Sequence, residues 1–411
     1  MRYLRPKWAG RFACAASACP DSCCRAGWEI IPDGETLTRY ESLPGPVGER
    51  IRAGIAFPSR EELSWGQRDF FTICAAELRK WYPLPSSWHR ASPPGPEDAA
   101  CGGGHWPPEV QEEPLLRQDE NRVCVLLDPD GLCCVQRSFG HQALCRVCRE
   151  YPRFHREFGA LTELGLSLSC PTAYALAVGE APAWEEWEDE APPVPNELDP
   201  EAYLRLRKGR DLALELLARE ELPLSRRLEL LHRLAAAMQA APEGRIKHDY
   251  DVRLRRWSSL PTQRRSQGVA GICLRTNAAL PKGGQALLVP TQFSKAGRLA
   301  RRFLELEILS PAWKDALERF LALAEAGTLP EGPPEDPEPY ARWLWNQLYK
   351  YWLDALDDGN LLGRVDRSLD MLLLGMAMDR ALPGEGPFLR RMSREIEHCE
   401  ENLAALLGQD P

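Results

Sequence analysis

Cysteine is distributed very unevenly along this chain of 411 residues, and 12 of its 14 cysteines precede residue 171. The N-terminus, residues 1–8, is basic but leads into polar sequence, where a secreted protein would carry an apolar signal segment. The longest apolar stretch, near 371–378, is far shorter than the roughly 18 residues that a membrane span requires. We therefore expect a cytoplasmic protein without membrane contact, in which clustered thiols bind metals or act in catalysis instead of forming disulfides.

The cysteines fall into two groups. The first packs four thiols into eleven residues: Cys14, Cys19, Cys23 and Cys24. The second is spread over a longer stretch and contains Cys124, Cys133, Cys134, Cys145, Cys148 and Cys170. Soft thiolates at such density select zinc, copper(I) or an iron–sulfur cluster. The pattern predicts a metal centre, for which the two groups must meet in space.

Spacing alone does not choose the metal. A zinc ribbon needs two Cys-x2-Cys pairs, and only Cys145–Cys148 has that separation. The Cys-x3-Cys-x2-Cys signature of radical S-adenosylmethionine enzymes is missed, because Ala26 stands where the third cysteine would fall. Locally, we expect a hairpin around Gly131 that presents cysteines 124 and 133, and a helical segment over 139–149 that brings Cys148 beside them.

Changes in composition predict the domain organisation. Residues 1–180 should form a small, irregular, Cys-rich α/β domain with a proline- and glycine-rich insertion loop at 83–118. An acidic, proline-rich linker at 181–200 should be extended and solvated. Over 201–411, apolar residues recur at three- and four-residue steps. This predicts a mainly α fold, in which the Cys-rich domain packs on an all-α domain with helices near 201–241, 295–309, 311–326, 340–356, 362–381 and 387–407.

Charge and motifs exclude two common classes. The formal charge of −9, from 51 basic and 60 acidic residues, argues against a general nucleic-acid binder, which needs a basic face. No Gly-x-Gly-x-x-Gly loop follows a convincing strand, which disfavours a Rossmann-type nucleotide site.

Several motifs together resemble the flagellin lysine-N-methylase family. The opening block is Phe12-x-Cys14-x4-Cys19-x3-Cys23-Cys24, followed by Gly27-Trp28, Ile30-x2-Asp33 and Tyr40. The later blocks are Cys124-x2-Leu-Asp128, Cys133, Gly140, Cys148-x2-Tyr151-Pro152-Arg153 and Leu168-Ser169-Cys170-Pro171. The resemblance is strong over 1–180 and weaker in the helical half, where Leu344-Trp345-Asn346-Gln347-Leu348 is similar to part of the family's C-terminal helix.

This resemblance implies eight metal-ligating cysteines and a methyltransferase activity. The eight are Cys14, Cys19, Cys23, Cys24, Cys124, Cys133, Cys148 and Cys170, which leaves Cys74, Cys101, Cys134 and Cys145 as extras. It implies transfer of methyl groups from S-adenosylmethionine to lysine ε-amino groups of flagellin or another protein. It further implies a [4Fe–4S] cluster on four of the eight cysteines, with zinc as the alternative metal.

The attacking lysine must be neutral, although its ordinary pKa is near 10.4, so a base or a desolvated channel is required. Asp33, Tyr40, Tyr151 and Arg153 lie in or near the cysteine blocks and are candidates to position or deprotonate the amine. Each can instead cap a turn, pack in the core or form an ion pair. The donor would bind in a pocket of unfamiliar shape or at an open iron site of the cluster.

Two other classes of protein use the same cysteines. One is a non-enzymatic zinc- or iron-binding protein whose helical half is a docking platform, and the other is an electron-transfer or redox-sensing protein. Cofactor content distinguishes zinc binding from the cluster, and donor binding distinguishes the methyltransferase from the redox protein.

Overall fold

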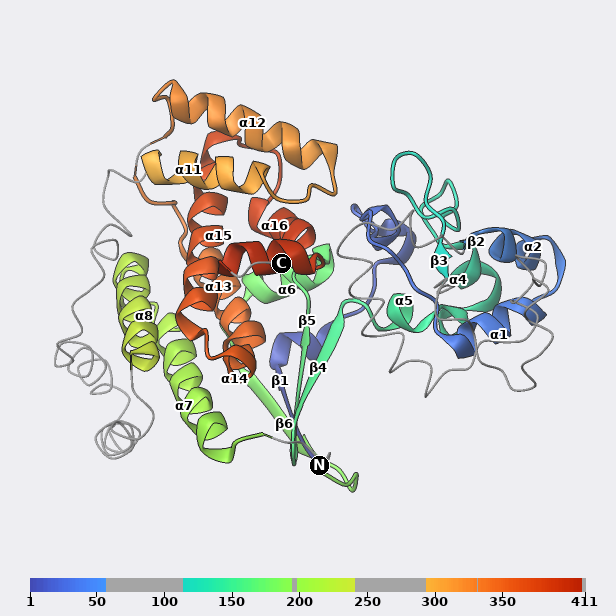
Figure 1. The fold of residues 1–411 in the computed structure, drawn as a ribbon, viewed down its shortest axis with the longest axis horizontal. Helices are drawn as coiled ribbons and strands as arrows, with labels where there is room; N and C mark the ends of the chain where they lie inside the picture. Colours follow the sequence, from blue (N-terminus) through green and yellow to red (C-terminus); the bar gives the residue numbers. More distant parts are fainter. Residues whose placement is uncertain (57–113, 194–197, 241–292, 331, 409–411) are drawn as a thin grey trace, which may run out of the picture. The chain divides into compact units, whose positions relative to one another are not determined.

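The computed structural model describes residues 1–56, 114–193, 198–240, 293–330 and 332–408 (Figure 1). The chain divides into two compact units. The helical unit contains Met1–Ala13 and Pro152–Asp410, and the cysteine unit contains Cys14–Tyr151. This division differs from the predicted domains 1–180 and 201–411, since both ends of the first predicted domain group with the helices. Residues 83–113 of the predicted insertion loop lie outside the described residues.

The helical unit contains a four-stranded sheet that the sequence patterns did not reveal. Its strands are β1 (Arg2–Pro6), β4 (Arg153–Phe158), β5 (Leu161–Leu166) and β6 (Trp184–Glu188), in the order β4-β5-β1-β6. Strands β4 and β5 form an antiparallel hairpin, and Gly159 between them has a φ of 65°, which favours glycine. Strand β1 runs parallel to β5 and antiparallel to β6. The N-terminus is therefore held in the sheet.

Strand β6 corrects the prediction of a solvated linker at 181–200. It is extended, but it pairs with β1 along its whole length. Two cross-strand contacts account for the pairing: the rings of Tyr3 and Trp187 stack at 5.3 Å, and Arg5 Nε donates to Glu185 Oε2 at 2.8 Å. Acidic residues of β6 lie opposite basic residues of β1, Glu188 opposite Arg2 and Glu185 opposite Arg5, so the paired strands carry complementary charges.

Helices make up most of the helical unit, and the predicted mainly α fold is confirmed. They are α6 (Pro171–Gly179), α7 (Pro200–Leu217), α8 (Leu224–Gln239), α11 (Phe293–Leu304), α12 (Pro311–Glu325), α13 (Glu338–Tyr351), α14 (Ala355–Asp358), α15 (Leu361–Ala381), α16 (Phe388–Ile396) and α17 (Glu400–Leu407), with 3-10 turns η1 (Lys7–Arg11) and η9 (Trp352–Asp354). The pair predicted over 201–241 is observed as α7 and α8, which lie side by side (Figure 1). Asp199 caps α7 by accepting from Glu201 N at 2.8 Å.

Two helices are shorter than their periodicity predicts. Helix α11 ends at Leu304, because the following backbone N–H groups of Glu307 and Leu309 donate to the side chains of Asn402 and Glu395. The helix predicted over 387–407 is interrupted between α16 and α17, where the buried Glu397 turns inward. At the end of α11 the backbone N–H groups thus bond to distant side chains, and between α16 and α17 the Glu397 carboxylate bonds to α13.

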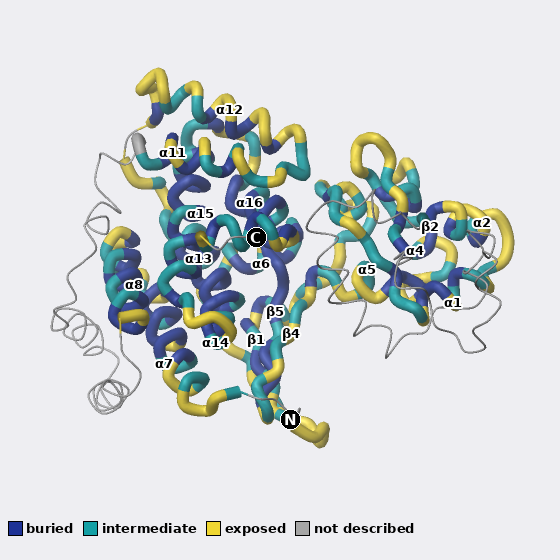
Figure 2. Tube along the Cα trace, in the orientation of Figure 1, coloured by how far each residue is buried: buried dark blue, intermediate teal, exposed yellow. Residues whose placement is uncertain are grey.

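Helices α13 and α15 form the centre of the unit. Figure 2 shows both buried along most of their length. Helix α13 contacts α6, α7 and α15, and α15 also contacts α8, α11 and α16. The prediction that α15 is buried on most faces is thus confirmed. Among the described residues, no helix combines the length and apolar character needed to cross a bilayer.

The cysteine unit consists of short elements around a small core. They are η2 (Ala16–Ala18), η3 (Cys23–Arg25), α1 (Gly34–Ser42), α2 (Gly45–Ala53), α4 (Cys134–Phe139), η6 (His141–Ala143), α5 (Arg146–Glu150) and the paired strands β2 (Ile55–Ala56) and β3 (Leu115–Leu116). The core is built on Leu37, Tyr40, Ile51, Leu126 and Val135, and several cysteines pack against it. Thiols therefore serve as part of the apolar core of this unit.

Candidate metal centre and a buried polar site

Backbone contacts bring the two cysteine groups together in the cysteine unit. Cys124 N donates to Cys24 O at 2.9 Å, which joins the first group to the second. The predicted hairpin around Gly131 is reduced to a single bridge between Leu127 and Cys133, and Cys124 is bridged to Gln118 instead. Arg50 holds this loop by donating to Val125 O at 2.8 Å and to Asp128 at 2.5 Å. The loop is therefore held by Arg50, through its ion pair with Asp128 and its hydrogen bond to Val125 O, where we predicted paired strands.

The helical segment predicted over 139–149 is also interrupted. Gly140 has a φ of 82° and ends α4, and a new helix, α5, begins after Cys145. Cys133 and Cys145 are the N-caps of α4 and α5. The free N–H groups at a helix start stabilise a thiolate, so these two positions favour ionised sulfur.

Seven cysteines form what we call the thiol cluster: Cys23, Cys24, Cys124, Cys133, Cys134, Cys145 and Cys148. Three pairs of side chains are hydrogen-bonded within it, 23 with 24, 133 with 134, and 145 with 148. Charge on Cys133 acts on Cys24, Cys124 and Cys145, which links the pairs to one another. Cys134 and Cys145, which we took as extras, lie inside the cluster.

The pKa values of the cluster thiols are shifted in opposite directions. A hydrogen bond from Cys134 lowers the pKa of Cys133 to about 6, with help from backbone N–H groups of α4. The thiol of Cys148 in the same way lowers the pKa of Cys145. Burial raises the pKa of Cys124 to about 12, and the charges of neighbouring thiols add to this. Ionised thiols so close together repel one another, and a bound cation would remove that repulsion.

Three of the predicted ligands, Cys14, Cys19 and Cys170, are not among the seven thiols of the cluster. Cys14 and Cys19 flank the turn η2, and Ala16 within it has a left-handed φ of 49°. This turn lies near the Gly131 loop, since a Cβ on Gly131 would be 3.6 Å from Ser17 O. Cys170 belongs to the helical unit, where it is buried as the N-cap of α6. Cys74 and Cys101 lie outside the described residues.

Two of the candidate catalytic residues have structural roles in the cysteine unit. Asp33 caps α1 by accepting from Thr36 N, and it also accepts from Arg146 N at the start of α5, both at 2.9 Å. Burial raises the pKa of Asp33, but these hydrogen bonds outweigh it and leave the pKa below its usual value. Burial, together with the charges of Cys145 and Cys148, raises the pKa of Tyr40 well above 10. Neither group is set to accept a proton near neutral pH.

The other two candidates, Tyr151 and Arg153, lie on opposite sides of the division between the units. The ring of Tyr151 packs against Trp28 in the cysteine unit, with centroids 5.1 Å apart. Arg153 is exposed on β4 of the helical unit, where its guanidinium lies 5.1 Å from the Phe12 ring. The four candidates are therefore not gathered into one site within either unit.

The spacing of the cluster thiols bears on the metal. In the described part of the chain, one group of three ligand-type side chains converges within 4.8 Å: Glu307, Cys399 and Glu401 of the helical unit. There the Cys399 thiol donates to both carboxylates, at 3.4 and 3.3 Å. The sulfurs around one zinc ion lie about 3.8 Å apart when Zn–S is about 2.3 Å. Among the described residues, no three thiols of the cluster lie within 4.8 Å of one another.

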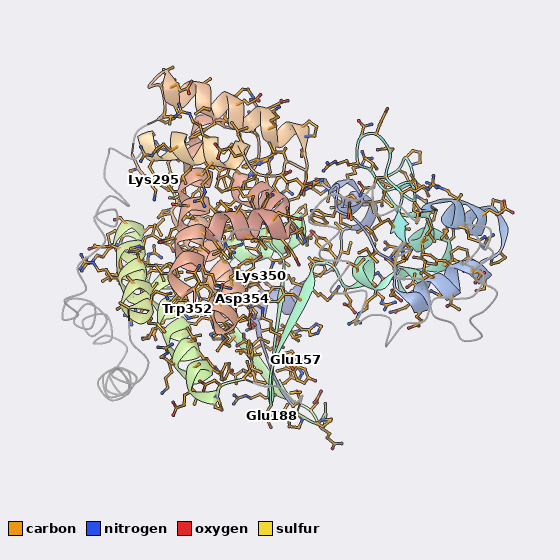
Figure 3. The ribbon with its side chains drawn as sticks, viewed as in Figure 1. Glu157, Glu188, Lys295, Lys350, Trp352 and Asp354 are labelled. Atoms are coloured by element: carbon orange, nitrogen blue, oxygen red, sulfur yellow. The ribbon has the colours of Figure 1, made fainter. Side chains whose placement is uncertain are left out.

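A second group of interacting polar side chains lies in the helical unit, and the sequence patterns did not predict that they meet. Lys350, which is labelled in Figure 3, lies near the end of α13. Its Nζ donates to Glu397 Oε2 at 2.6 Å. Gln347 Nε2 and Tyr351 OH donate to the same carboxylate, at 2.6 and 3.1 Å. Burial would raise the pKa of Glu397, but the Lys350 charge and these hydrogen bonds lower it to about 2. The pair is thus charged at neutral pH.

This depressed pKa predicts a loss of stability in acid. The folded pKa of Glu397 is about 2, below the ordinary value of 4.5, so its contribution is complete above pH 5 and is lost as the pH falls toward 2. Unfolding by urea, measured at several pH values, should show a decline of a few kcal/mol over this range. In the Glu397→Gln variant the decline should be smaller; an equal decline would contradict the assignment.

Ser169 and His398 extend the buried polar site. His398 Nε2 lies 2.9 Å from Ser169 Oγ, and Ser169 Oγ lies 2.8 Å from Ser167 Oγ. Burial and the nearby Lys350 lower the pKa of His398 to about 4, so the imidazole is neutral at physiological pH. The motif Leu168-Ser169-Cys170-Pro171 therefore contributes a hydroxyl to this site as well as its cysteine.

Comparison with known proteins gives partial matches. The chain is 26% identical over 167 residues to the flagellar biosynthetic protein FliU of Salmonella muenchen, which is 40% of this chain and 70% of that protein. It is 27% identical over 167 residues to the lysine-N-methylase of Salmonella typhimurium and 26% identical to that of Salmonella choleraesuis. No family model and no solved structure matches.

The match covers 30% of the length of each lysine-N-methylase and 40% of this chain. Most of this chain and most of each lysine-N-methylase therefore lie outside the matched region. Within the matched 167 residues, the chain is related to the lysine-N-methylases, and the predicted resemblance to that family is confirmed.

Proposed function

We propose that this protein is a protein-lysine N-methyltransferase that carries a [4Fe–4S] cluster and methylates flagellin. The similarity to proteins named lysine-N-methylase supports the reaction, and the flagellar name of a further relative supports flagellin as the substrate. The observation that carries the metal part of the proposal is the thiol cluster, in which thiols from four separate segments lie close enough to interact. Cys124, Cys134 and Cys145 among them are buried.

Five of the eight predicted ligands lie in this cluster, and we assign one from each of its four segments to the metal: Cys24, Cys124, Cys133 and Cys148. Four thiolates are enough for one cubane. When bound, the cluster supplies positive charge that compensates these thiolates. A hydrogen bond from Cys134, together with backbone N–H groups of α4, lowers the pKa of Cys133. Burial and the charges of the nearby Cys145 and Cys148 raise the pKa of Tyr40.

In the proposed reaction, the neutral lysine nitrogen attacks the methyl carbon of S-adenosylmethionine. The N–C bond forms as the C–S bond breaks, S-adenosylhomocysteine leaves, and the proton on the new secondary amine passes to a base or to solvent. The carbon–sulfur electron pair stays on the leaving sulfur, so no oxidant or reductant is needed.

The decisive experiment is anaerobic purification followed by analysis of iron, sulfide and zinc. We expect about four irons and four sulfides per chain, with broad absorption near 400 nm, as is typical of such clusters. The same preparation should then transfer labelled methyl groups from S-adenosylmethionine to flagellin, and no label should enter flagellin whose surface lysines are replaced by arginine.

Two results would contradict the proposal. Stoichiometric zinc without sulfide would make the thiol cluster a zinc site. A full complement of iron and sulfide without methyl transfer to flagellin or to any lysine-containing peptide would favour an electron-transfer or redox-sensing protein.

A further inference from the structure

The helical unit contains an open pocket of about 540 Å³, which we call the acidic pocket. It is formed by the end of α6, the start of α13, the end of α15 and the loop that joins α15 to α16. Two tyrosines and two aspartates line it beside apolar residues: Tyr174, Tyr340, Asp336 and Asp379, with Val178 and Leu382. Its volume lies within the range of ligand pockets, which runs from about 300 to 1,000 Å³.

One hydroxyl of the acidic pocket has no partner. Tyr174 is 8% exposed, and within the described part of the chain its OH makes no hydrogen bond. The hydroxyl itself is not completely shielded from solvent, so a group that enters the pocket can reach it. Because buried polar groups are nearly always hydrogen-bonded, this hydroxyl indicates a polar ligand.

The two carboxylates of the acidic pocket accept hydrogen bonds from neutral donors. Asp379 Oδ1 accepts from Phe388 N at 2.8 Å and Oδ2 accepts from Tyr340 OH at 3.1 Å. Asp336 Oδ1 accepts from Glu338 N at 3.0 Å. Neither carboxylate forms an ion pair with a basic side chain of the described residues. A carboxylate oxygen accepts up to two hydrogen bonds, so both side chains can accept more.

Three arginines lie near the acidic pocket but do not line it: Arg380, Arg390 and Arg391. Arg380 donates to Gly332 O. The guanidinium of Arg391 lies 5.1 Å from the Phe388 ring and donates to Glu385 O. Burial raises the pKa of Asp379, and its hydrogen bonds and the charge of Arg391 offset this only in part. A cation bound in the pocket would therefore stabilise the Asp379 carboxylate.

The loop between α15 and α16 fixes one wall of the acidic pocket. Gly384 and Gly386 line the pocket with φ values of 85° and 83°, which favour glycine. Glu385 between them is held by Arg319 of α12, at 2.5 and 2.8 Å, and does not line the pocket. The wall is therefore formed without a ligand, which lowers the entropic cost of binding.

A lysine side chain is complementary to this lining. Its ammonium carries one positive charge and three donors, which match the accepting positions of Asp379, Asp336 and the Tyr174 hydroxyl. Tyrosine rings also attract a cation, and the apolar stem of lysine can pack on Val178 and Leu382. A phosphate or carboxylate ligand would be repelled by the two aspartates.

We propose that the acidic pocket binds a charged lysine side chain of the protein substrate and so docks the substrate on the helical unit. The identity of the partner rests on the proposed function, whereas the cationic chemistry rests on Tyr174, Asp336 and Asp379. The docked lysine is not the lysine that is methylated. Carboxylates stabilise the charged ammonium, whereas the attacking amine must be neutral.

The test measures, by fluorescence anisotropy, how two dye-labelled peptides bind to the full-length, anaerobically purified protein. One is Gly-Ser-Lys-Ser-Gly, capped at both ends, and the other carries norleucine, which has the stem of lysine without the ammonium. We expect the lysine peptide to bind at least tenfold more tightly at low salt, and this advantage should shrink as the salt concentration rises.

Two variants test the residues of the pocket. Tyr174→Phe removes only a hydroxyl without a partner in the described part of the chain, so the variant should fold normally and bind the lysine peptide severalfold more weakly. Asp379→Asn removes the buried charge and should weaken the same peptide about tenfold. Neither change should affect the norleucine peptide. With flagellin as substrate, Asp379→Asn should raise KM and leave kcat unchanged, because the docked lysine does not react.

A matched control is Glu385→Gln, which makes the same carboxylate-to-amide change on the adjoining loop, in a side chain bound to Arg319. It should leave the difference between the peptides unchanged. If the two peptides bind equally, or if Tyr174→Phe and Asp379→Asn leave their difference intact, the inference is wrong, while the proposed function stands. If the difference depends on both residues but no methyl group is transferred to flagellin, the pocket binds a lysine as inferred, and only its assigned partner falls with the proposed function.

Discussion

Replacing Glu163 by glutamine is expected to lower the free energy of unfolding by about 3–5 kcal/mol. Glu163 of β5 and Arg210 of α7 form a two-pronged ion pair, with Arg210 Nη1 at 2.7 Å from Glu163 Oε2, and each side chain is 1% exposed. Glutamine would leave the Arg210 charge buried without its counterion. The loss of stability comes from that uncompensated charge. The intact ion pair itself stabilises the fold little more than a well-packed apolar pair of the same size would.

The measurement is urea unfolding of the variant beside a control on the same sheet. Glu185→Gln makes the same substitution in a pair with Arg5, whose side chains are 43% and 30% exposed, and should cost less than about 1 kcal/mol. The double variant Glu163→Leu with Arg210→Met should recover much of the lost stability. Equal losses for Glu163→Gln and Glu185→Gln would show that burial of the pair has no energetic weight.

Replacing Cys124 or Cys148 by serine should abolish the metal centre and the methyl transfer. The loss of activity should exceed about 100-fold, because the loss of outer-shell partners alone costs roughly 10–100-fold at metal sites. Both residues lie in the thiol cluster on different segments, so each would remove one ligand of the proposed cubane. Iron and sulfide per chain, the absorption near 400 nm and methylation of flagellin are the three readouts.

Cys399→Ser is the matched control for this experiment. Cys399 is also a buried thiol, but it lies in the helical unit and donates to Glu307 and Glu401. The variant should retain iron, sulfide and activity. Full iron content in both Cys124→Ser and Cys148→Ser would refute the assignment of these ligands. Full activity in variants that have lost all iron would separate methyl transfer from the cluster.

Periodicity predicted the helices well, and it failed where single side chains decide the boundaries. The pair α7 and α8 and the buried α15 follow from apolar residues at three- and four-residue steps. The interruption at Glu397 could not be predicted, because a charged residue in helical register signals an exposed face. Its burial depends on Lys350, which lies 47 positions earlier in the chain.

The sequence predicted where thiols gather better than it predicted which thiols belong together. Clustered cysteines predicted a metal centre, and the structure gathers both groups except Cys170 in one unit. Cys134 and Cys145 were set aside as extras, although their thiols hydrogen-bond to Cys133 and Cys148. Gln347 was noticed only as part of the Leu344–Leu348 motif, and Trp8, whose buried Nε1 has no partner among the described residues, gave no signal, since an unpaired polar atom exists only after the surrounding chain has folded.

The sequence by itself determined the helical content and the thiol chemistry of this protein, because both follow from residue types at short spacing. Only the tertiary structure decided the sheet, the division into units and the acidic pocket. Strand β1 pairs with β5 and β6, more than 150 residues away, and strands so short carry too weak a pattern to select a partner. Buried charges such as Glu163 and Glu397 are stable only beside their counterions, and those lie on distant segments of the chain.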